Sequence, residues 1–388
     1  MIGHEVVDRL LHFRPVDAPV LSAYVAVPPD PGELRGAEAR FRSVLKPIRE
    51  LADSHELEHH PRESLRADVA RVLDVGKRAV EFTGHAVAVF ACQRAGLYEE
   101  VVLPPRVRDR AVVDATPYVR PLLAVLDEAH RFCVVVVDRE HAWLYEYFMG
   151  ELEAAEKAHG RALREPNYAG GWQGYKEDHT HHKAALLARR HYRETAEAAE
   201  DLLRRTGAEL LIVGGHEETV AEFLPYLSHE AQPKVAGTFV VDPSTLTPGQ
   251  VREQAEKVVD AYERAEEARL VGEALEKVAA GGFGAVGLEW CLMAVNEQAV
   301  GLLLVHDDQQ APGRACDNCG WLGLAGDECP VCRQRTRETP DVIDEVAEAV
   351  LGAGGRVEHV YAETAMPAHT VAALLRFPVQ RPPERSLR

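Results

Sequence analysis

Four cysteines have the residue type and spacing that most clearly indicate chemistry. Cys316 and Cys319 form one C-x-x-C pair, and Cys329 and Cys332 form a second pair after nine intervening residues. Each pair can present two thiolates to one ion, and two pairs together complete a tetrahedral site that suits Zn²⁺. Because four sulfurs leave no open coordination position, we predict a structural zinc, with iron as the alternative metal.

The remaining cysteines indicate whether the protein occupies a reducing or an oxidising compartment. The chain has seven in all, and Cys92, Cys133 and Cys291 lie in apolar runs where buried core thiols are expected. An odd total with one tight cluster fits metal binding in a reducing compartment better than a disulfide framework. No apolar run approaches the roughly 20 residues of a transmembrane helix, and the first residues lack a signal-peptide pattern. We therefore expect a cytoplasmic protein without a membrane partner.

A second candidate site is the stretch 167–183, which reads NYAGGWQGYKEDHTHHK. Asp178, His179, His181 and His182 are possible metal ligands, but their spacing matches neither a zinc helix nor a C-x-x-C partner set. The run AGGWQG also lacks the Lys-Ser/Thr ending of a phosphate-binding loop and does not directly follow a strand. Both interpretations are therefore less favoured than a loop that reaches another molecule.

Such a reaching loop has the residues that RNA contact requires. Gly170 and Gly171 allow close backbone approach, while Trp172 and Tyr175 could stack on bases. A basic stripe continues from this loop into the following helix, and its members are Lys176, Lys183, Arg189, Arg190 and Arg193. Aromatic residues next to basic ones predict an RNA-contacting element. The alternative, a solvated helix face beside a core tryptophan, stays open.

Composition limits these hypotheses. The chain has 388 residues, of which 46% belong to the hydrophobic set, so it is globular and long enough for two or three domains. The net charge of −18 would argue against a nucleic-acid partner, because neutralising phosphates needs clustered Lys and Arg. The basic stripe is a local exception to that average.

The pattern of apolar runs predicts an α/β fold in three domains. We expect an N-terminal α/β domain over residues 1–125 and a middle domain with a mixed or parallel sheet and the long glycine-containing loop over 126–270. The third is an α/β/α domain over 271–388 with a zinc-ribbon-like cysteine insertion at 313–336. A helix is predicted from about residue 183 to 206, where Gly207 ends it, and a capping box at Thr247–Gln250 predicts a second long helix.

Several of these features together resemble one family. They are PYVRPLL at 117–123, VVVVDREHAWLYEY at 134–147, GGWQGY before a basic helix, and the α/β/α last segment. In these the chain resembles the bacterial branch of the archaeo-eukaryotic class-one release factor superfamily, which includes Balon-like hibernation factors and Vms1-like peptidyl-tRNA hydrolases. The resemblance implies three domains, and in archaeal members the last domain can contain a zinc insertion.

The resemblance also bears on the glycine loop. Release factors place Gly-Gly-Gln at the tip of the middle domain, where it helps water attack the peptidyl ester. Gly170 and Gly171 match the two glycines, but Trp172 intervenes and Gln173 comes one position late. Gln173 is thus a candidate catalytic residue if the chain is similar to Vms1-like members, and not if it is similar to Balon-like members. The stop-codon motifs Asn-Ile-Lys-Ser and Tyr-x-Cys do not occur in residues 1–125.

Three functions therefore remain for testing. The first is a factor that binds the ribosomal A site through rRNA and possibly tRNA contacts, in hibernation or ribosome protection and not in stop-codon reading. An elongation-factor GTPase is a candidate partner. The second is a peptidyl-tRNA ester hydrolase that uses Gln173. The third is a metal-stabilised interaction or stress protein without an RNA partner.

Overall fold

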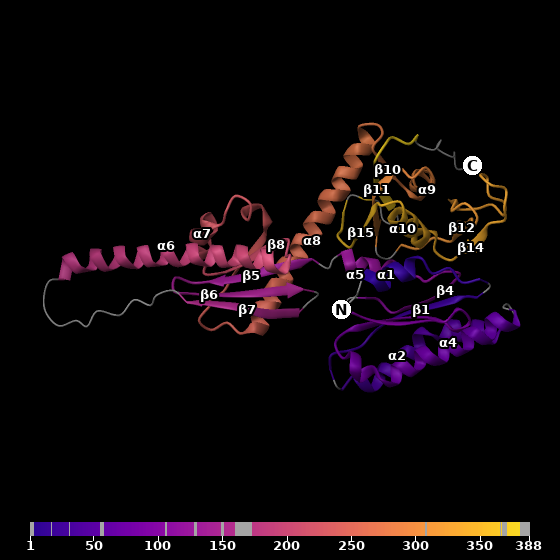
Figure 1. Cartoon of the computed structure of the whole chain (residues 1–388), viewed down its shortest axis with the longest axis horizontal. Helices are drawn as coiled ribbons and strands as arrows, with labels where there is room; N and C mark the ends of the chain where they lie inside the picture. The colour runs from indigo at the N-terminus through magenta and orange to yellow at the C-terminus, as the bar shows by residue number, and fades with distance from the viewer. Residues whose placement is uncertain are drawn as a thin grey trace. The chain divides into compact units, whose positions relative to one another are not determined.

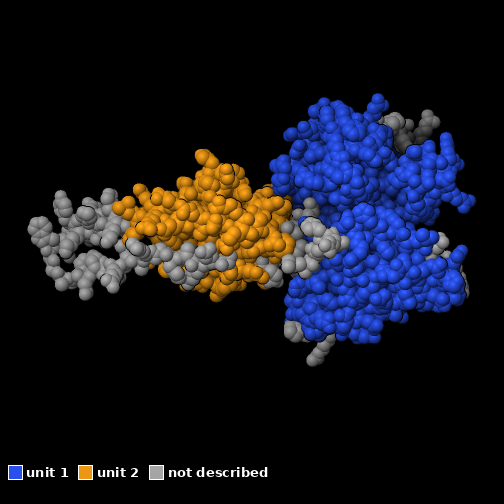
Figure 2. Space-filling view, viewed as in Figure 1, with its two compact units in different colours: residues 1–128, 266–388 blue, residues 129–265 orange. Residues whose placement is uncertain are grey.

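The structure is a computed structural model with two compact units, which Figure 2 draws in different colours. One unit comprises Met1–Glu128 with Glu266–Arg388, and the other comprises Ala129–Ala265. The residues described are 4–16, 18–30, 32–54, 58–104, 107–127, 130–148, 151–159, 173–306, 309–364, 366 and 371–380. The predicted division into three domains, with boundaries after residues 125 and 270, stays a prediction.

The first unit begins with a four-stranded antiparallel sheet in the order β3-β2-β1-β4. Its strands are β1 (Val20–Ala26), β2 (Ala86–Cys92), β3 (Leu97–Leu103) and β4 (Arg110–Asp114). Strand β2 is buried along its whole length, which explains its continuous apolar sequence AVAVFAC. Both faces of this sheet are therefore covered.

Helices provide that cover (Figure 1). On one face lie α2 (Ala37–Val44), α3 (Lys46–Asp53) and α4 (His59–Lys77), whose Phe41, Leu45 and Leu65 are fully buried. On the other face lie α1 (His4–Leu11) and α5 (Arg120–Asp127), which pack Leu10 and Leu122 near Tyr24 and Phe90.

The C-terminal part of the same unit has a second sheet in the order β10-β16-β11-β15. Its strands are β10 (Gly284–Val286), β11 (Val300–His306), β15 (Arg356–Val360) and β16 (Val371–Leu375), and only the β11–β15 pair is parallel. Helices α9 (Leu288–Asn296) and α10 (Val342–Gly352) share one core with this sheet. The second half of α8 (Pro248–Ala279) shares another core with it. Helices thus pack on both faces.

A small third sheet has the four cysteines in the segments that connect its strands. It runs in the order β13-β12-β14 and consists of β12 (Gly313–Ala315), β13 (Leu322–Gly323) and β14 (Arg337–Thr339). Asn296, the last residue of α9, holds strand β13 in place. The Asn296 side chain donates to the Leu322 carbonyl at 2.8 Å and accepts from the Leu322 amide at 2.9 Å. The sheet therefore projects from the end of α9.

The second unit is a five-stranded sheet in the order β7-β6-β5-β8-β9. Its strands are β5 (Arg131–Val137), β6 (His141–Phe148), β7 (Glu151–His159), β8 (Leu210–Gly215) and β9 (Val235–Val240). Strands β5, β8 and β9 are parallel, while β5, β6 and β7 form an antiparallel meander. Helices α6 (Gln173–Thr206) and α7 (Glu217–Phe223) share one core with the sheet, and the first half of α8 packs in another.

These elements confirm the prediction of a mixed α/β chain with several sheets. Helix α6 ends at Thr206, and Gly207 follows with φ +68°. The prediction that Gly207 ends this helix is therefore confirmed. The capping box is also confirmed, since the Thr247 amide donates to the Gln250 side chain at 2.9 Å. The start of α6 differs: the backbone is already helical at Gln173, ten residues before the predicted start, because no proline interrupts residues 173–183.

Short 3₁₀ helices are also present in both units. The 3₁₀ helices include Leu34–Gly36, Ala79–Phe82, Gln93–Ala95, Leu224–Tyr226 and Gln232–Lys234. Among the residues described above, no helix combines the length and apolar character that crossing a membrane would need.

Candidate functional site

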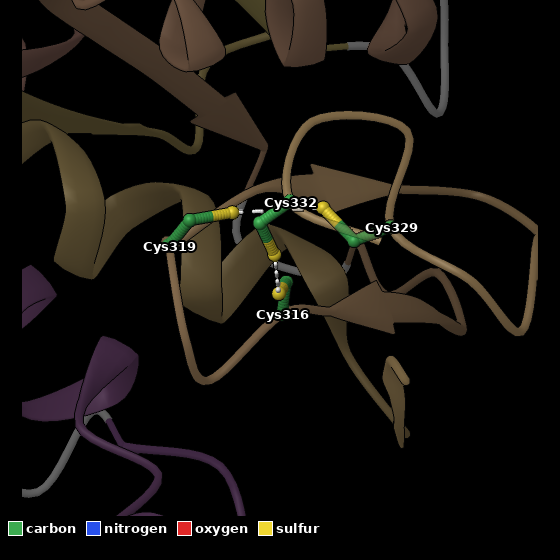
Figure 3. Close-up of side chains that lie close together, drawn as sticks. All are labelled: Cys316, Cys319, Cys329 and Cys332. Carbon is green, nitrogen blue, oxygen red and sulfur yellow. Dashed lines mark hydrogen bonds between the residues drawn. The ribbon is translucent and has the colours of Figure 1, made fainter. Parts of the chain in front are cut away.

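The four predicted cysteine ligands converge on one point (Figure 3). One ligand atom from each of Cys316, Cys319, Cys329 and Cys332 lies within 4.8 Å of the others. The Sγ atoms of Cys316 and Cys332 are 3.4 Å apart, and those of Cys319 and Cys329 are 3.5 Å apart. Sulfurs bound to one tetrahedral zinc at about 2.3 Å lie about 3.8 Å from each other, so this donor set has the size of a zinc site.

The two C-x-x-C turns repeat one backbone geometry. The carbonyl of Cys316 accepts from the Gly320 amide at 2.8 Å, and the carbonyl of Cys329 accepts from the Arg333 amide at 3.0 Å. Gly320 has φ +75° and Arg333 has φ +65°, so each turn closes with a left-handed residue after its second cysteine. In both turns the first cysteine's amide also donates to the carbonyl five residues later, at 2.8 Å. Two like turns thus present two sulfurs each.

The surroundings of these thiols suit metal ligation. Cys316 and Cys329 are buried, Cys332 is half-buried and Cys319 is exposed. The backbone amide of Gln334, followed by the Asn318 side chain, lowers the pKa of the Cys332 thiol to about 6. The Trp321 amide lowers the pKa of the Cys319 thiol, but desolvation and hydrogen bonds with the other three cysteines raise it to about 12, so metal binding would displace a proton from that thiol. With four sulfurs as ligands the site would be closed and structural.

A second group of potential metal ligands, not noticed in the sequence, lies at the start of α4. His59, His60 and Glu63 place one ligand atom each within 4.8 Å of the others, and His59 Nδ1 is 3.5 Å from Glu63 Oε2. The i, i+4 spacing of His59 and Glu63 could have revealed this pair. All three side chains are exposed, so we assign no site here.

The structure describes only part of the predicted glycine loop. Gly170, Gly171 and Trp172 lie outside the described residues. The candidate residues Gln173, Tyr175, Lys176 and Lys183 belong to α6, and the structure describes their helical backbone but not their side chains. Their predicted roles in catalysis and RNA binding stay predictions.

The remaining members of the basic stripe are on the outer face of α6. Tyr192 and Ala196 pack into the core, which turns Arg189, Arg190 and Arg193 outward, and all three are exposed. Arg190 Nε lies 2.7 Å from Glu194 Oε1, one turn later. This hydrogen bond to Glu194 raises the pKa of Arg190.

The charge on this face changes sign further along the helix. A shallow hollow follows the arginines, and it is lined by Glu194, Glu197, Ala198, Glu200, Asp201 and Arg204. Phosphate groups would be attracted to the arginine end and repelled by the acidic end. A nucleic-acid contact on this face would thus be limited to the part of α6 from Gln173 to Arg193.

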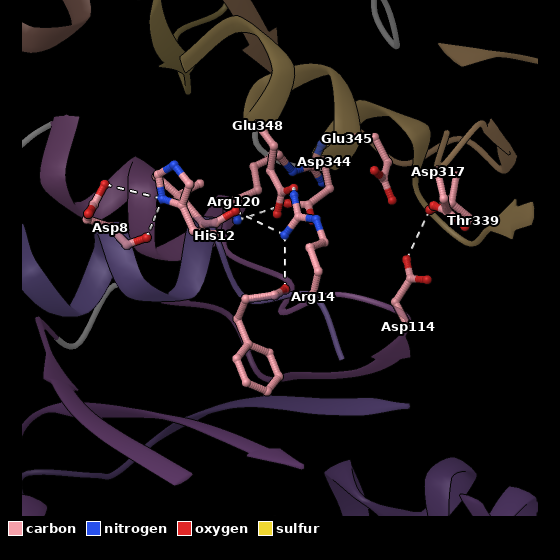
Figure 4. Close-up of polar contacts among 12 residues, drawn as sticks. Asp8, His12, Arg14, Asp114, Arg120, Asp317, Thr339, Asp344, Glu345 and Glu348 are labelled. Carbon is pink, nitrogen blue, oxygen red and sulfur yellow. Dashed lines mark hydrogen bonds and ion pairs between the residues drawn. The ribbon is translucent and has the colours of Figure 1, made fainter. Parts of the chain in front are cut away.

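The motif PYVRPLL has a structural role (Figure 4). The Tyr24 hydroxyl donates to the Tyr118 carbonyl at 2.6 Å, and the Tyr118 amide donates to the Ser22 hydroxyl at 2.9 Å. Arg120 points toward the carboxylates of α10, and its amide donates to Asp344 at 3.0 Å. The motif therefore attaches the first sheet to α10 within the first unit.

The described residues thus define a mixed α/β protein with a closed four-cysteine centre and an arginine-bearing helix. The family model described as bacterial archaeo-eukaryotic release factor family 10 matches residues 117–260. This match begins at the PYVRPLL motif and includes the five strands of the second unit together with α6. Over this segment the match supports the resemblance to the bacterial archaeo-eukaryotic release factor superfamily. No curated protein matches the chain.

Several solved structures are also similar to this chain. Archaeoglobus fulgidus Pelota is 18% identical over 76% of this chain and 80% of its own, with a TM-score of 0.35. A chain from the model of ribosome-bound archaeal Pelota and ABCE1 is 16% identical over 97% and 94%, with a TM-score of 0.41. S. cerevisiae Dom34, described as a translation termination-like factor, is 12% identical over 78% and 82%, with a TM-score of 0.38. TM-scores below 0.5 carry no conclusion about function.

Proposed function

We propose that this protein is a ribosome-associated translation factor that binds the ribosomal A site through rRNA and tRNA contacts. It acts in the cytoplasm, in hibernation or ribosome protection, and does not read stop codons. The observation that carries this proposal is the family match over residues 117–260, because that segment contains the glycine–tryptophan stretch and the exposed arginines of α6.

The proposed contact has two parts. Arg189, Arg190 and Arg193 would contact phosphate oxygens, which fixes position without reading sequence. Trp172 and Tyr175 would stack on unpaired bases. The acidic part of α6 from Glu194 to Asp201 would keep RNA away from the rest of that face, so the helix would approach RNA with residues 173–193.

Two further components belong to this proposal. One structural Zn²⁺ would be held by Cys316, Cys319, Cys329 and Cys332 and would stabilise a zinc-ribbon-like insertion without taking part in chemistry. An elongation-factor GTPase would deliver the protein to the ribosome, as the family resemblance implies.

A peptidyl-tRNA hydrolase is the second candidate function. It is favoured by the position of Gln173, which follows Gly170 and Gly171 with one intervening residue and begins α6. In this alternative Gln173 orients a water molecule toward the ester carbonyl, and the glycines allow close approach to the tRNA end.

Co-sedimentation with purified ribosomes tests the binding proposal. The variant Arg189→Ala/Arg193→Ala should bind about tenfold more weakly near 0.1 M salt and show a shallower salt dependence, because two phosphate contacts are lost. The matched control is Arg204→Ala/Arg205→Ala, which removes the same charge from the acidic end of the same helix. Equal losses in both variants would contradict a localised contact, and no binding at low salt would favour a protein without an RNA partner.

Peptide release separates the binder from the enzyme. Wild-type protein is mixed with stalled large subunits that carry peptidyl-tRNA, and Gln173→Ala is measured in parallel. Release that is lost in Gln173→Ala, while co-sedimentation is kept, supports the hydrolase. Binding without release supports the hibernation or protection factor.

A further inference from the structure

Arg337 lies directly beside the four-cysteine centre. It is the first residue of β14, and it pairs in register with Ala315 of β12, which precedes Cys316. The three strands of this small sheet have only two or three residues each. So short a sheet has little core of its own, and it depends on the metal and on its neighbours for rigidity.

The Arg337 guanidinium contacts three carboxylates from three different places. Its Nε lies 2.8 Å from Asp317, which sits inside the first C-x-x-C turn. Its Nη1 lies 3.4 Å from Asp114 at the end of β4, and its Nη2 donates to Glu345 of α10. Thr339, two residues further along β14, donates its hydroxyl to Asp114 at 3.0 Å (Figure 4). One arginine thus links the cysteine turn, the first sheet and α10.

These three contacts differ in exposure. The side chains of Asp114 and Glu345 are 12% and 11% exposed, whereas that of Asp317 is 73% exposed. Burial raises the pKa of the Asp114 and Glu345 carboxyls, and Arg337 opposes that shift in both. An exposed ion pair is weak unless its geometry is held in place. The Asp317 contact is therefore the one that depends on the fold of the cysteine turn.

We propose that metal binding at the four cysteines strengthens the attachment of β4 to the C-terminal part of the first unit through Asp317 and Arg337. A closed thiolate site fixes the turn that contains Asp317. Asp317 then fixes the Nε edge of Arg337, which leaves both Nη groups oriented toward Asp114 and Glu345. An arginine side chain has about 2 kcal/mol of rotamer entropy, so pre-orientation on one edge favours the contacts on the other.

Hydrogen–deuterium exchange of the full chain tests this inference, with and without treatment by a zinc chelator. Chelation should speed exchange at residues 110–116 by about tenfold, the factor expected for losing one hydrogen bond to a charged group. The variant Asp317→Ala, which removes no cysteine, should show the same increase while its metal content stays that of the wild type. Chelation should then add little further increase in this variant, because the link is already absent.

The matched control is Glu328→Ala. Glu328 lies on the same insertion and is 3.4 Å from Arg333, so the variant removes an exposed ion pair without touching Arg337. Its exchange at residues 110–116 should equal that of the wild type. Faster exchange confined to residues 313–339 after chelation would overturn the inference, as would unchanged exchange in Asp317→Ala. The inference rests on the proposed metal, so a chain that binds no metal also overturns it, whatever its ribosome binding.

Discussion

Arg120 and Asp341 form an ion pair in which each side chain is only 2% exposed, and Nη2 of Arg120 lies 3.1 Å from Oδ2 of Asp341. Asp341 is also the N-cap of α10 and accepts from the Ile343 amide at 3.2 Å. The Tyr118 hydroxyl accepts from Arg120 at 2.8 Å and lies 3.2 Å from Asp341. The pair joins the PYVRPLL motif to α10. The Tyr118 hydroxyl and the Ile343 amide offset part of the cost of burying two charges, whereas Nη1 of Arg120 has no hydrogen-bond partner among the described residues.

Removing one member of this pair should destabilise the first unit strongly. Arg120→Ala leaves the Asp341 carboxylate buried without its main counter-charge, and we expect a loss of roughly 3–5 kcal/mol in the free energy of unfolding. Urea unfolding of wild type and variant measures this loss. The control is Lys257→Ala, which removes an exposed pair with Glu253 and should leave the unfolding midpoint unchanged. Similar midpoints for all three proteins would contradict the structural role assigned to Arg120.

Glu348 should make the stability of the first unit depend on pH. Burial raises the pKa of its carboxyl to about 7, although Arg14, at 2.6 Å, opposes the shift. Asp344 and Glu345 of α10 face the same region, and burial raises the pKa of both. The folded state therefore binds a proton more tightly than the unfolded state does. Stability should be highest in acid and should fall as the pH rises through the interval that ends near 7.

The variant Glu348→Gln isolates this effect. Its stability relative to wild type should increase between pH 5 and pH 8, by at most roughly 3 kcal/mol. Urea unfolding at unit steps of pH measures the difference, which includes the Arg14 contact because that ion pair forms only when Glu348 is ionised. A difference that does not change with pH would show that Glu348 titrates normally in the folded protein.

Gly214 is a position where the fold of the second unit leaves no room for a side chain. A Cβ at this residue would lie 2.3 Å from the ring of Phe239, its neighbour across the β8–β9 pair. Gly214→Ala should therefore destabilise this unit by about 1–3 kcal/mol, the usual cost of overpacking. Gly249→Ala is the control, because nothing lies within 4 Å of a Cβ there and alanine favours a helix. Thermal unfolding should separate the two, and a stable Gly214→Ala protein would contradict the close packing of Phe239.

Local patterns allowed the sequence to predict many elements. Helix α6 was predicted to end before Gly207 and ends at Thr206, because Gly207, with φ +68°, is the left-handed residue that stops the helix. The cysteine centre was predictable for the same reason, since both pairs have short, local spacing. The family resemblance also rested on contiguous motifs, and the family match begins at one of them.

Elements that depend on distant partners could not be predicted in this way. Strand β7 consists of ELEAAEKAH, a composition that favours helices, and it is a strand because it pairs along its length with β6. Helix α4 was not predicted; its Pro61 lies in the first turn, where proline is tolerated. Similarly, no local signal links Arg120 to Asp341 or Arg337 to Asp114. The role of Gln173 stays a prediction, because the structure does not describe its side chain.

The four-cysteine centre should bind one metal ion per chain, and its loss should lower stability. Elemental analysis of protein purified without chelators should find about one zinc per chain, since four thiolates at this spacing complete one tetrahedral site. Cys332→Ser should lose the metal and melt at a lower temperature, because binding energy at a structural site is also folding energy. Cys291→Ser is the control: this thiol is fully buried in the core, and burial raises its pKa to about 12, so the variant should keep its metal. An iron–thiolate absorption band in place of zinc would identify the alternative metal, whereas full metal content in Cys332→Ser would refute the four-sulfur site.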